Sequence, residues 1–163
     1  MLALLAVVSS ALALGVAADF VPAGSAAHFF SSQNPSLVFA PEFAASGANL
    51  VAANPGDGSS TDITALYAVF GTGVPTQIVY GDWCITAKGV VPQSSSQTLY
   101  IADCDPDDEA QFWTINEEPA TVSNADGNCI TLGRAAKGVV VSLGECTEAL
   151  QHLQLWDPKP VSA

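Results

Sequence analysis

A repeated pattern of cysteine, tryptophan and strand-like segments constrains the fold of this chain more than any other feature. Two copies are clear, and equivalent points are separated by 45, 42 and 43 residues. The matched segments are 83–87 with 128–132, 99–104 with 141–146, and Gln111-Phe112-Trp113 with Gln154-Leu155-Trp156. Turn residues introduce each copy, Gly81-Asp82 in one and Asp126-Gly127 in the other, as β-hairpins require. A repeat of this length predicts that each copy forms one structural unit.

A third, weaker copy is predicted upstream. Leu37-Val38-Phe39-Ala40 lies 47 residues before Cys84-Ile85-Thr86-Ala87, and residues 50–54 match the strand that begins at Leu99. Ala65-Leu66-Tyr67 takes the place of the Gln-x-Trp triplet. This copy has neither the cysteines nor the glutamine, so it is the least regular of the three.

Three units, each with four short strands, are too few for a propeller and too rich in strands for a helical solenoid. The sequence therefore predicts an all-β fold, a β-trefoil with pseudo-repeats at about 28–75, 76–119 and 120–160, the first one degenerate. The predicted core positions are Leu50, Ala52, Leu99, Ile101, Val141 and Leu143, with bulky aromatics Tyr67, Trp113 and Trp156 around them. Loops are predicted at 54–62, 71–76 and 92–97.

Cysteine usage and the first residues predict the compartment. Residues 1–18 are apolar and end in small residues before Asp19, which is typical of a secretory signal peptide, leaving a single domain over 19–163. Four cysteines fit an oxidising, extracellular destination. Three pairings are possible in principle, and the repeat favours Cys84–Cys104 and Cys129–Cys146. We expect a secreted protein with no membrane segment in the mature chain.

Charge excludes some partners. The chain has 163 residues, 16 of them acidic and 4 basic, which gives a net charge of −12. Nucleic acids and anionic membranes attract basic surfaces, so neither is an expected partner.

The cysteine and Gln-x-Trp units resemble those of the ricin B-type lectin family, over residues 77–157 and more weakly over 28–70. The resemblance implies a β-trefoil that binds glycans, with Gln111, Trp113, Gln154 and Trp156 in structural roles. Family sugar pockets use an Asp two residues after the first cysteine, where this chain has Thr86, Thr131 and, in the weak copy, Phe39. The aromatic positions hold Ala102 and Gly144, and the Asn positions hold Ala110 and Leu153. The resemblance therefore implies a lectin-like protein whose standard pocket residues are largely replaced.

Two aromatic residues are not needed for the predicted core. Trp83 precedes a cysteine where the matching segment 128–132 has the polar Asn128, and Tyr100 alternates with Leu99 and Ile101. Beside Asp82 they could stack on a sugar ring at a non-standard site, or pack under a loop or the N-terminal segment. The predicted carbohydrate-binding residues are Asp82, Trp83, Thr86, Tyr100 and Thr131.

Other side chains give no catalytic or metal motif. Residues 103–109 hold five carboxylates but lack the Gly and Glu of an EF-hand loop, so they predict a solvated turn. His28 and His152 lie in different copies without a nucleophile motif. We expect a protein that is not an enzyme and has no cofactor or metal.

Three functions remain as hypotheses. The first is a carbohydrate-binding module. The second is a β-trefoil that binds a protein through loops 54–62 and 103–109, as a protease inhibitor or effector would. The third is a structural component of a wall or coat.

Overall fold

The computed structural model describes residues 20–59, 61–87 and 97–161, which form twelve short strands and a few helical turns. The predicted signal peptide and most of the predicted loop 92–97 lie outside these residues. The strands are β1 (Ser25–Ser31), β2 (Asn34–Pro41), β3 (Leu50–Ala53), β4 (Leu66–Ala68), β5 (Pro75–Tyr80), β6 (Trp83–Ala87), β7 (Gln97–Asp103), β8 (Phe112–Ile115), β9 (Val122–Ser123), β10 (Asn128–Thr131), β11 (Ser142–Glu145) and β12 (Trp156–Pro160). The helical turns are η1 (Glu109–Gln111), η2 (Glu148–Leu150) and α1 (Gln151–Gln154). The prediction of an all-β chain is confirmed.

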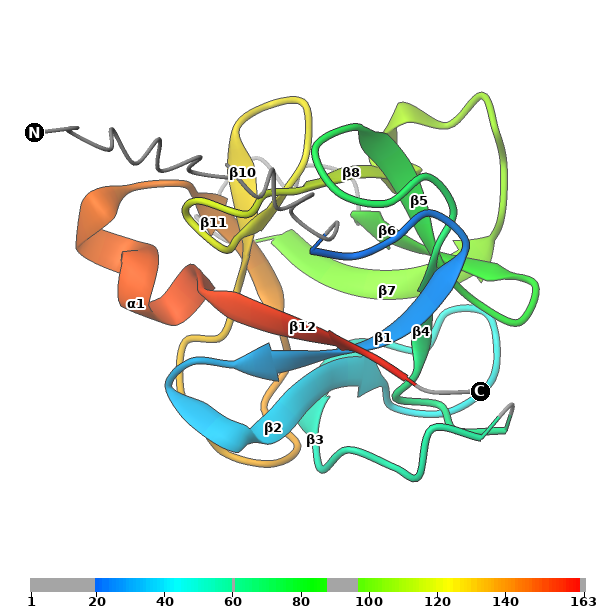
Figure 1. Cartoon of the computed structure of the whole chain (residues 1–163), viewed down its shortest axis with the longest axis horizontal. Coiled ribbons are helices and arrows are strands. Elements are labelled where there is room, and N and C mark those ends of the chain that lie inside the picture. The colour runs from blue at the N-terminus through cyan, green and yellow to red at the C-terminus, as the bar shows by residue number, and fades with distance from the viewer. Residues whose placement is uncertain (1–19, 60, 88–96, 162–163) are drawn as a thin grey trace, which may run out of the picture.

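Six strands form a barrel-like ring. β1, β4, β5, β8 and β9 pair in this order, and every pairing is antiparallel. β12 returns to pair with β1, so the first and last strands lie side by side (Figure 1). The remaining side of the ring is bridged by a hydrogen bond of 2.7 Å from the Trp156 N–H to the Ala120 carbonyl. The ring leaves few strand edges unpaired, which protects a sheet against pairing with other chains.

The other six strands form three hairpins, β2–β3, β6–β7 and β10–β11. One strand of each hairpin contacts the other two hairpins. β7 pairs with β11, Asn49 bridges to Tyr100, and Val51 bridges to Val140, so the three contacts close a triangle. Together with the ring, this arrangement is consistent with the predicted β-trefoil.

Hydrophobic side chains from all three hairpins meet in one core. The six predicted core residues are buried, as are Trp113 and Trp156. The prediction for Tyr67 is wrong, because its side chain is 44% exposed while the preceding Leu66 is fully buried. A strand alternates its faces with a period of two, so Leu66 and Ala68 take the inner face of β4 and Tyr67 takes the outer one.

The strand register shows that the predicted alignment of Phe39 with Thr86 is wrong by one residue. Phe39 pairs with Ala52, as Ile85 pairs with Ile101, so Ala40 and not Phe39 occupies the position of Thr86. Phe39 is fully buried, and its ring contacts that of Trp156 edge-on at a centroid distance of 4.8 Å. A shift of one residue exchanges the two faces of a strand, and the apolar weak copy offered no polar residue to fix the register.

The two buried tryptophans make matching hydrogen bonds. The Trp113 indole N–H donates to the Ile85 carbonyl and the Trp156 indole N–H to the Ile130 carbonyl, both at 2.9 Å. Each acceptor directly follows the first cysteine of its unit. Ile101 lies opposite Ile85 in the β6–β7 ladder, but its N–H donates to the Ala48 carbonyl. The Ile85 carbonyl therefore takes its hydrogen bond from the Trp113 indole and not from Ile101.

The glutamines of the triplets also act alike. Nε2 of Gln111 donates to the Asp103 carbonyl and Nε2 of Gln154 to the Glu145 carbonyl, each at 2.9 Å. Each of these carbonyls belongs to the residue before a second cysteine, and the disulfides are Cys84–Cys104 and Cys129–Cys146, as predicted. The expected structural roles, a core Trp and a Gln that binds the backbone, are therefore seen at all four residues.

Replacing one indole tests this arrangement. Trp113→Phe leaves the buried Ile85 carbonyl without its donor and removes part of a packed ring, so we expect unfolding free energy to fall by about 2–3 kcal/mol. Urea unfolding monitored by circular dichroism measures the change. Tyr67→Phe, on the exposed face of β4, serves as the control and should change stability by less than about 0.5 kcal/mol. Equal stability of Trp113→Phe and the parent chain would contradict the proposed role.

Candidate functional site

The two threonines at the family's Asp positions are engaged within the chain. Thr86 is 3% exposed and Thr131 8% exposed. The Thr86 hydroxyl donates to the Cys84 carbonyl at 3.2 Å. The Thr131 hydroxyl donates to the Cys129 carbonyl at 2.8 Å and accepts from Gln154 Nε2 at 3.1 Å. These buried hydroxyls bond to carbonyls of their own strands, so they are poorly placed to meet a ligand.

Trp83 and Tyr100 do not form the aromatic pair considered from the sequence. In the β6–β7 ladder, Trp83 pairs with Asp103 and Tyr100 pairs with Thr86. Because Trp83 and Thr86 are three residues apart on one strand, the two aromatic side chains lie on opposite faces of the hairpin. Because they face opposite sides of the hairpin, no single sugar ring can contact both side chains. Both side chains are half-buried.

Trp83 instead stacks on Tyr80. The two residues are cross-strand partners on either side of the exposed turn Gly81-Asp82, and their ring centroids are 6.3 Å apart at an interplanar angle of 23°. Gly81 has a φ of 58°, which suits the first central position of a type II′ turn. The predicted turn is thus confirmed, and it brings Trp83 beside Tyr80 with Asp82 in the turn.

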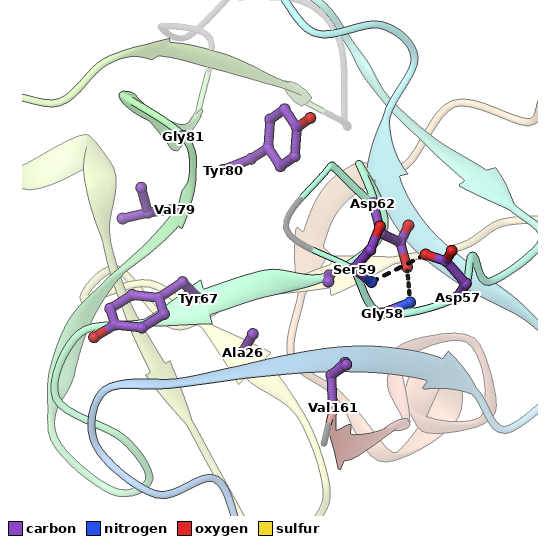
Figure 2. A pocket seen from close by; sticks show the side chains of 11 residues that line it. Ala26, Asp57, Gly58, Ser59, Asp62, Tyr67, Val79, Tyr80, Gly81 and Val161 are labelled. Atoms are coloured by element: carbon purple, nitrogen blue, oxygen red, sulfur yellow. Dashed lines mark hydrogen bonds between the residues drawn. The ribbon is translucent and has the colours of Figure 1, made fainter. Parts of the chain in front are cut away.

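A cleft of about 530 Å³ lies beside this turn. Figure 2 shows Tyr67, Val79 and Tyr80 on one side of it and Asp57, Ser59 and Asp62 on the other. We call it the tyrosine cleft, after Tyr67 and Tyr80. Its walls combine apolar rings with carboxylate and hydroxyl groups, and they come from β4, β5 and the loop between β3 and β4.

Asp62 organises the loop that forms the acidic wall. Its Oδ1 accepts hydrogen bonds from the Thr64 N–H at 2.9 Å and the Thr64 hydroxyl at 2.6 Å. Its Oδ2 accepts from the Gly58 N–H at 2.7 Å and contacts His28 Nε2 at 2.9 Å. A Cβ on Gly56 would clash with the Asp62 carboxylate, so the backbone closes around this side chain only because Gly56 has no Cβ.

The pKa of Asp62 follows from these contacts. Burial alone would raise it, but hydrogen bonds from Thr64, Gly58 and His28 stabilise the carboxylate and lower its pKa from 3.8 to about 2. The pKa of exposed Asp57 is also lowered, by hydrogen bonds from Ser59. Both carboxylates are therefore ionised at neutral pH, and the cleft is negatively charged.

His28 belongs to this network, and its partners explain its burial. Thr64 stands two residues before Leu66, as Gln111 stands two residues before Trp113. The Thr64 hydroxyl accepts from the Gly56 N–H, and Gln111 Oε1 accepts from the Asp105 N–H, both at 2.8 Å. The Thr64 hydroxyl thus makes the same acceptor contact as Gln111 Oε1, and His28 Nε2 contacts that hydroxyl at 3.0 Å.

The acidic segment 103–109 forms hydrogen bonds with its own backbone. Asp105 Oδ1 accepts from the Asp107 N–H, and Asp108 caps η1 by accepting from the Ala110 N–H.

Among the described residues, no group of three or more His, Cys, Asp or Glu side chains is arranged to hold a metal ion. No helix in that part of the chain is long and apolar enough to span a membrane.

The residues of the tyrosine cleft were not selected from the sequence. The sequence predicts Tyr67 near the core, and it predicts residues 54–62 only as a loop that contacts a protein partner in the second hypothesis. The turn Gly81-Asp82 already placed Tyr80 opposite Trp83, so Tyr80 could have been found. The approach of residues 57–62 to β4 and β5 depends on tertiary packing, for which the sequence carries no local signal.

The fold has close counterparts among solved structures. The C-terminal half of an earthworm R-type lectin, solved with GalNAc, matches at 12% identity and a TM-score of 0.63, covering 83% of this chain and 98% of that one. Cytolethal distending toxin from Actinobacillus actinomycetemcomitans matches at 17% identity and a TM-score of 0.62, covering 85% and 93%. These similarities establish a shared fold.

A mosquitocidal holotoxin matches at 12% identity and a TM-score of 0.66 over 86% of this chain. This chain spans only 17% of the length of that toxin. No protein-family model matches the chain, and no curated protein resembles it significantly in sequence.

Neutralising Asp62 tests the loop network. Asp62→Asn should lower the free energy of unfolding by about 2 kcal/mol at pH 7, because one pKa unit corresponds to about 1.4 kcal/mol. The folded-state pKa is depressed, so this stabilisation is present above about pH 4 and is lost as pH falls toward about 2. Thermal unfolding of both proteins should thus show a stability difference that shrinks as the pH falls below 4. A difference that does not change with pH would contradict the network.

Proposed function

We propose that this chain is a secreted, non-catalytic carbohydrate-binding module of the ricin B-type lectin family. In this proposal it is a β-trefoil of three related units, whose standard sugar pockets are degenerate and whose residues 1–18 direct secretion. A glycan is the proposed partner, as GalNAc is for the earthworm lectin of similar fold.

The observation that carries the family assignment is the recurrence of one contact set in two units. In each, an indole binds the carbonyl after the first cysteine, and a glutamine binds the carbonyl before the second cysteine. A disulfide joins the two cysteines in both units. These are the residues by which the sequence resembles the lectin repeats, and the R-type lectin fold supports the same assignment.

The geometry of His28 supports a non-catalytic role. In hydrolases that use a hydroxyl nucleophile, a histidine bridges the acid and the hydroxyl through opposite ring nitrogens. Here Asp62 and Thr64 both contact Nε2 of His28. Two disulfides in a chain of this size support an extracellular location.

A glycan array tests the proposal. We expect the chain from Asp19 to Ala163 to bind at least one class among galactosides, xylan, chitin and glucan, with and without added Ca²⁺. A reduced and alkylated sample provides the control, because binding should require the disulfide-bonded fold. The absence of binding to all four classes of glycan would contradict carbohydrate binding and favour the hypothesis of a protein partner.

A further inference from the structure

We propose that the sugar site is the tyrosine cleft and not the positions of Thr86 and Thr131. We further propose that this cleft accepts an uncharged pyranose ring. This inference rests on the proposed function, because it names the site and ligand class of that activity. The volume of about 530 Å³ lies in the range of small-molecule pockets, roughly 300–1,000 Å³.

Tyr67 provides the apolar platform. It lies in β4 between Ala26 of β1 and Val79 of β5, which are its neighbours across the sheet. Small or short side chains on both flanks leave the ring accessible. An aromatic ring offers a flat apolar surface with a polar tip, which suits the C–H face of a pyranose and its hydroxyl rim.

The opposite wall supplies hydrogen-bond acceptors and donors. Oδ1 of Asp57 accepts from the Ser59 N–H at 3.0 Å, and the exposed Asp57 carboxylate lines the cleft (Figure 2). The Ser59 hydroxyl is 3.1 Å from that of Thr61. A carboxylate oxygen that faces a cleft can accept from a sugar hydroxyl, and charge-assisted hydrogen bonds are stronger than neutral ones.

The acidic wall is held in place before any ligand arrives. Asp62 fixes the loop through Gly58, Thr64 and His28, as described above. Gly58 has a φ of 76°, and a Cβ there would clash with the Val161 side chain, so the loop packs tightly against the residue that follows β12. A preorganised site loses less conformational entropy on binding, which favours affinity for a small ligand.

Charge selects against anionic sugars. Asp57 and Asp62 are both ionised, the described residues that line the cleft include no Lys or Arg, and the chain carries a net charge of −12. A uronate, sialic acid or sulfated ring would bring a like charge into this wall, which is unfavourable. The cleft therefore fits uncharged sugars.

The test compares variants of the full mature chain by calorimetric titration. The probes are GalNAc, lactose, xylotriose, chitotriose and laminaritriose, with 3′-sialyllactose as the anionic counterpart of lactose. Tyr67→Ala should weaken binding of the neutral probes roughly tenfold or more, and Asp57→Asn should weaken it severalfold. Phe43→Ala and Asp107→Asn are matched controls, since Phe43 is an aromatic residue 52% exposed outside the cleft and Asp107 is exposed in another loop. Both should bind like the parent chain.

Each outcome is decisive. Loss in Tyr67→Ala and Asp57→Asn with both controls intact supports the tyrosine cleft. Unchanged binding in these two variants overturns the site while leaving carbohydrate binding in place, and a preference for 3′-sialyllactose over lactose overturns the ligand class. If the parent chain binds none of the probes and the array is also silent, the site and the proposed function fall together. Tyr67 is surface-exposed, so near-ultraviolet circular dichroism should show that Tyr67→Ala remains folded.

Discussion

The hydrogen bonds between buried indoles and hairpin carbonyls are the interactions on which the rest of this structure depends. Trp113 and Trp156 each fill the core and satisfy a backbone carbonyl of a neighbouring hairpin, Ile85 or Ile130. A buried carbonyl without a donor is costly, so each contact fixes where a hairpin sits on the barrel-like ring. The first unit has no tryptophan; Leu66 is buried there, and Phe39 packs its ring against Trp156.

The regular units were predictable because their markers are chemically specific. Cysteines must pair, a buried Trp needs an acceptor, and the spacing of both recurs, so the disulfides and the core followed from the sequence. The first unit lacks these markers. Its apolar strands fit either face, and both Phe39 and Tyr67 were misplaced by one residue, since small apolar neighbours do not fix a register.

The candidate site shows why binding residues were harder to find. Predicting it required knowing that the Thr86 hydroxyl donates to the Cys84 carbonyl. It also required knowing that Trp83 and Tyr100 lie on opposite faces of the hairpin, which the strand register decides. The tyrosine cleft arises where the first unit departs from the others. The network of His28, Asp62 and Thr64 holds the loop that forms one wall of the cleft.

A crystal structure of the mature chain soaked with the neutral probe that binds best tests the central claim most directly. The account predicts a pyranose ring against the Tyr67 side chain with a hydroxyl within hydrogen-bond distance of Asp57, and with the Asp62 loop unchanged. Density for the sugar beside Thr86 or Thr131, with the tyrosine cleft empty, would contradict it.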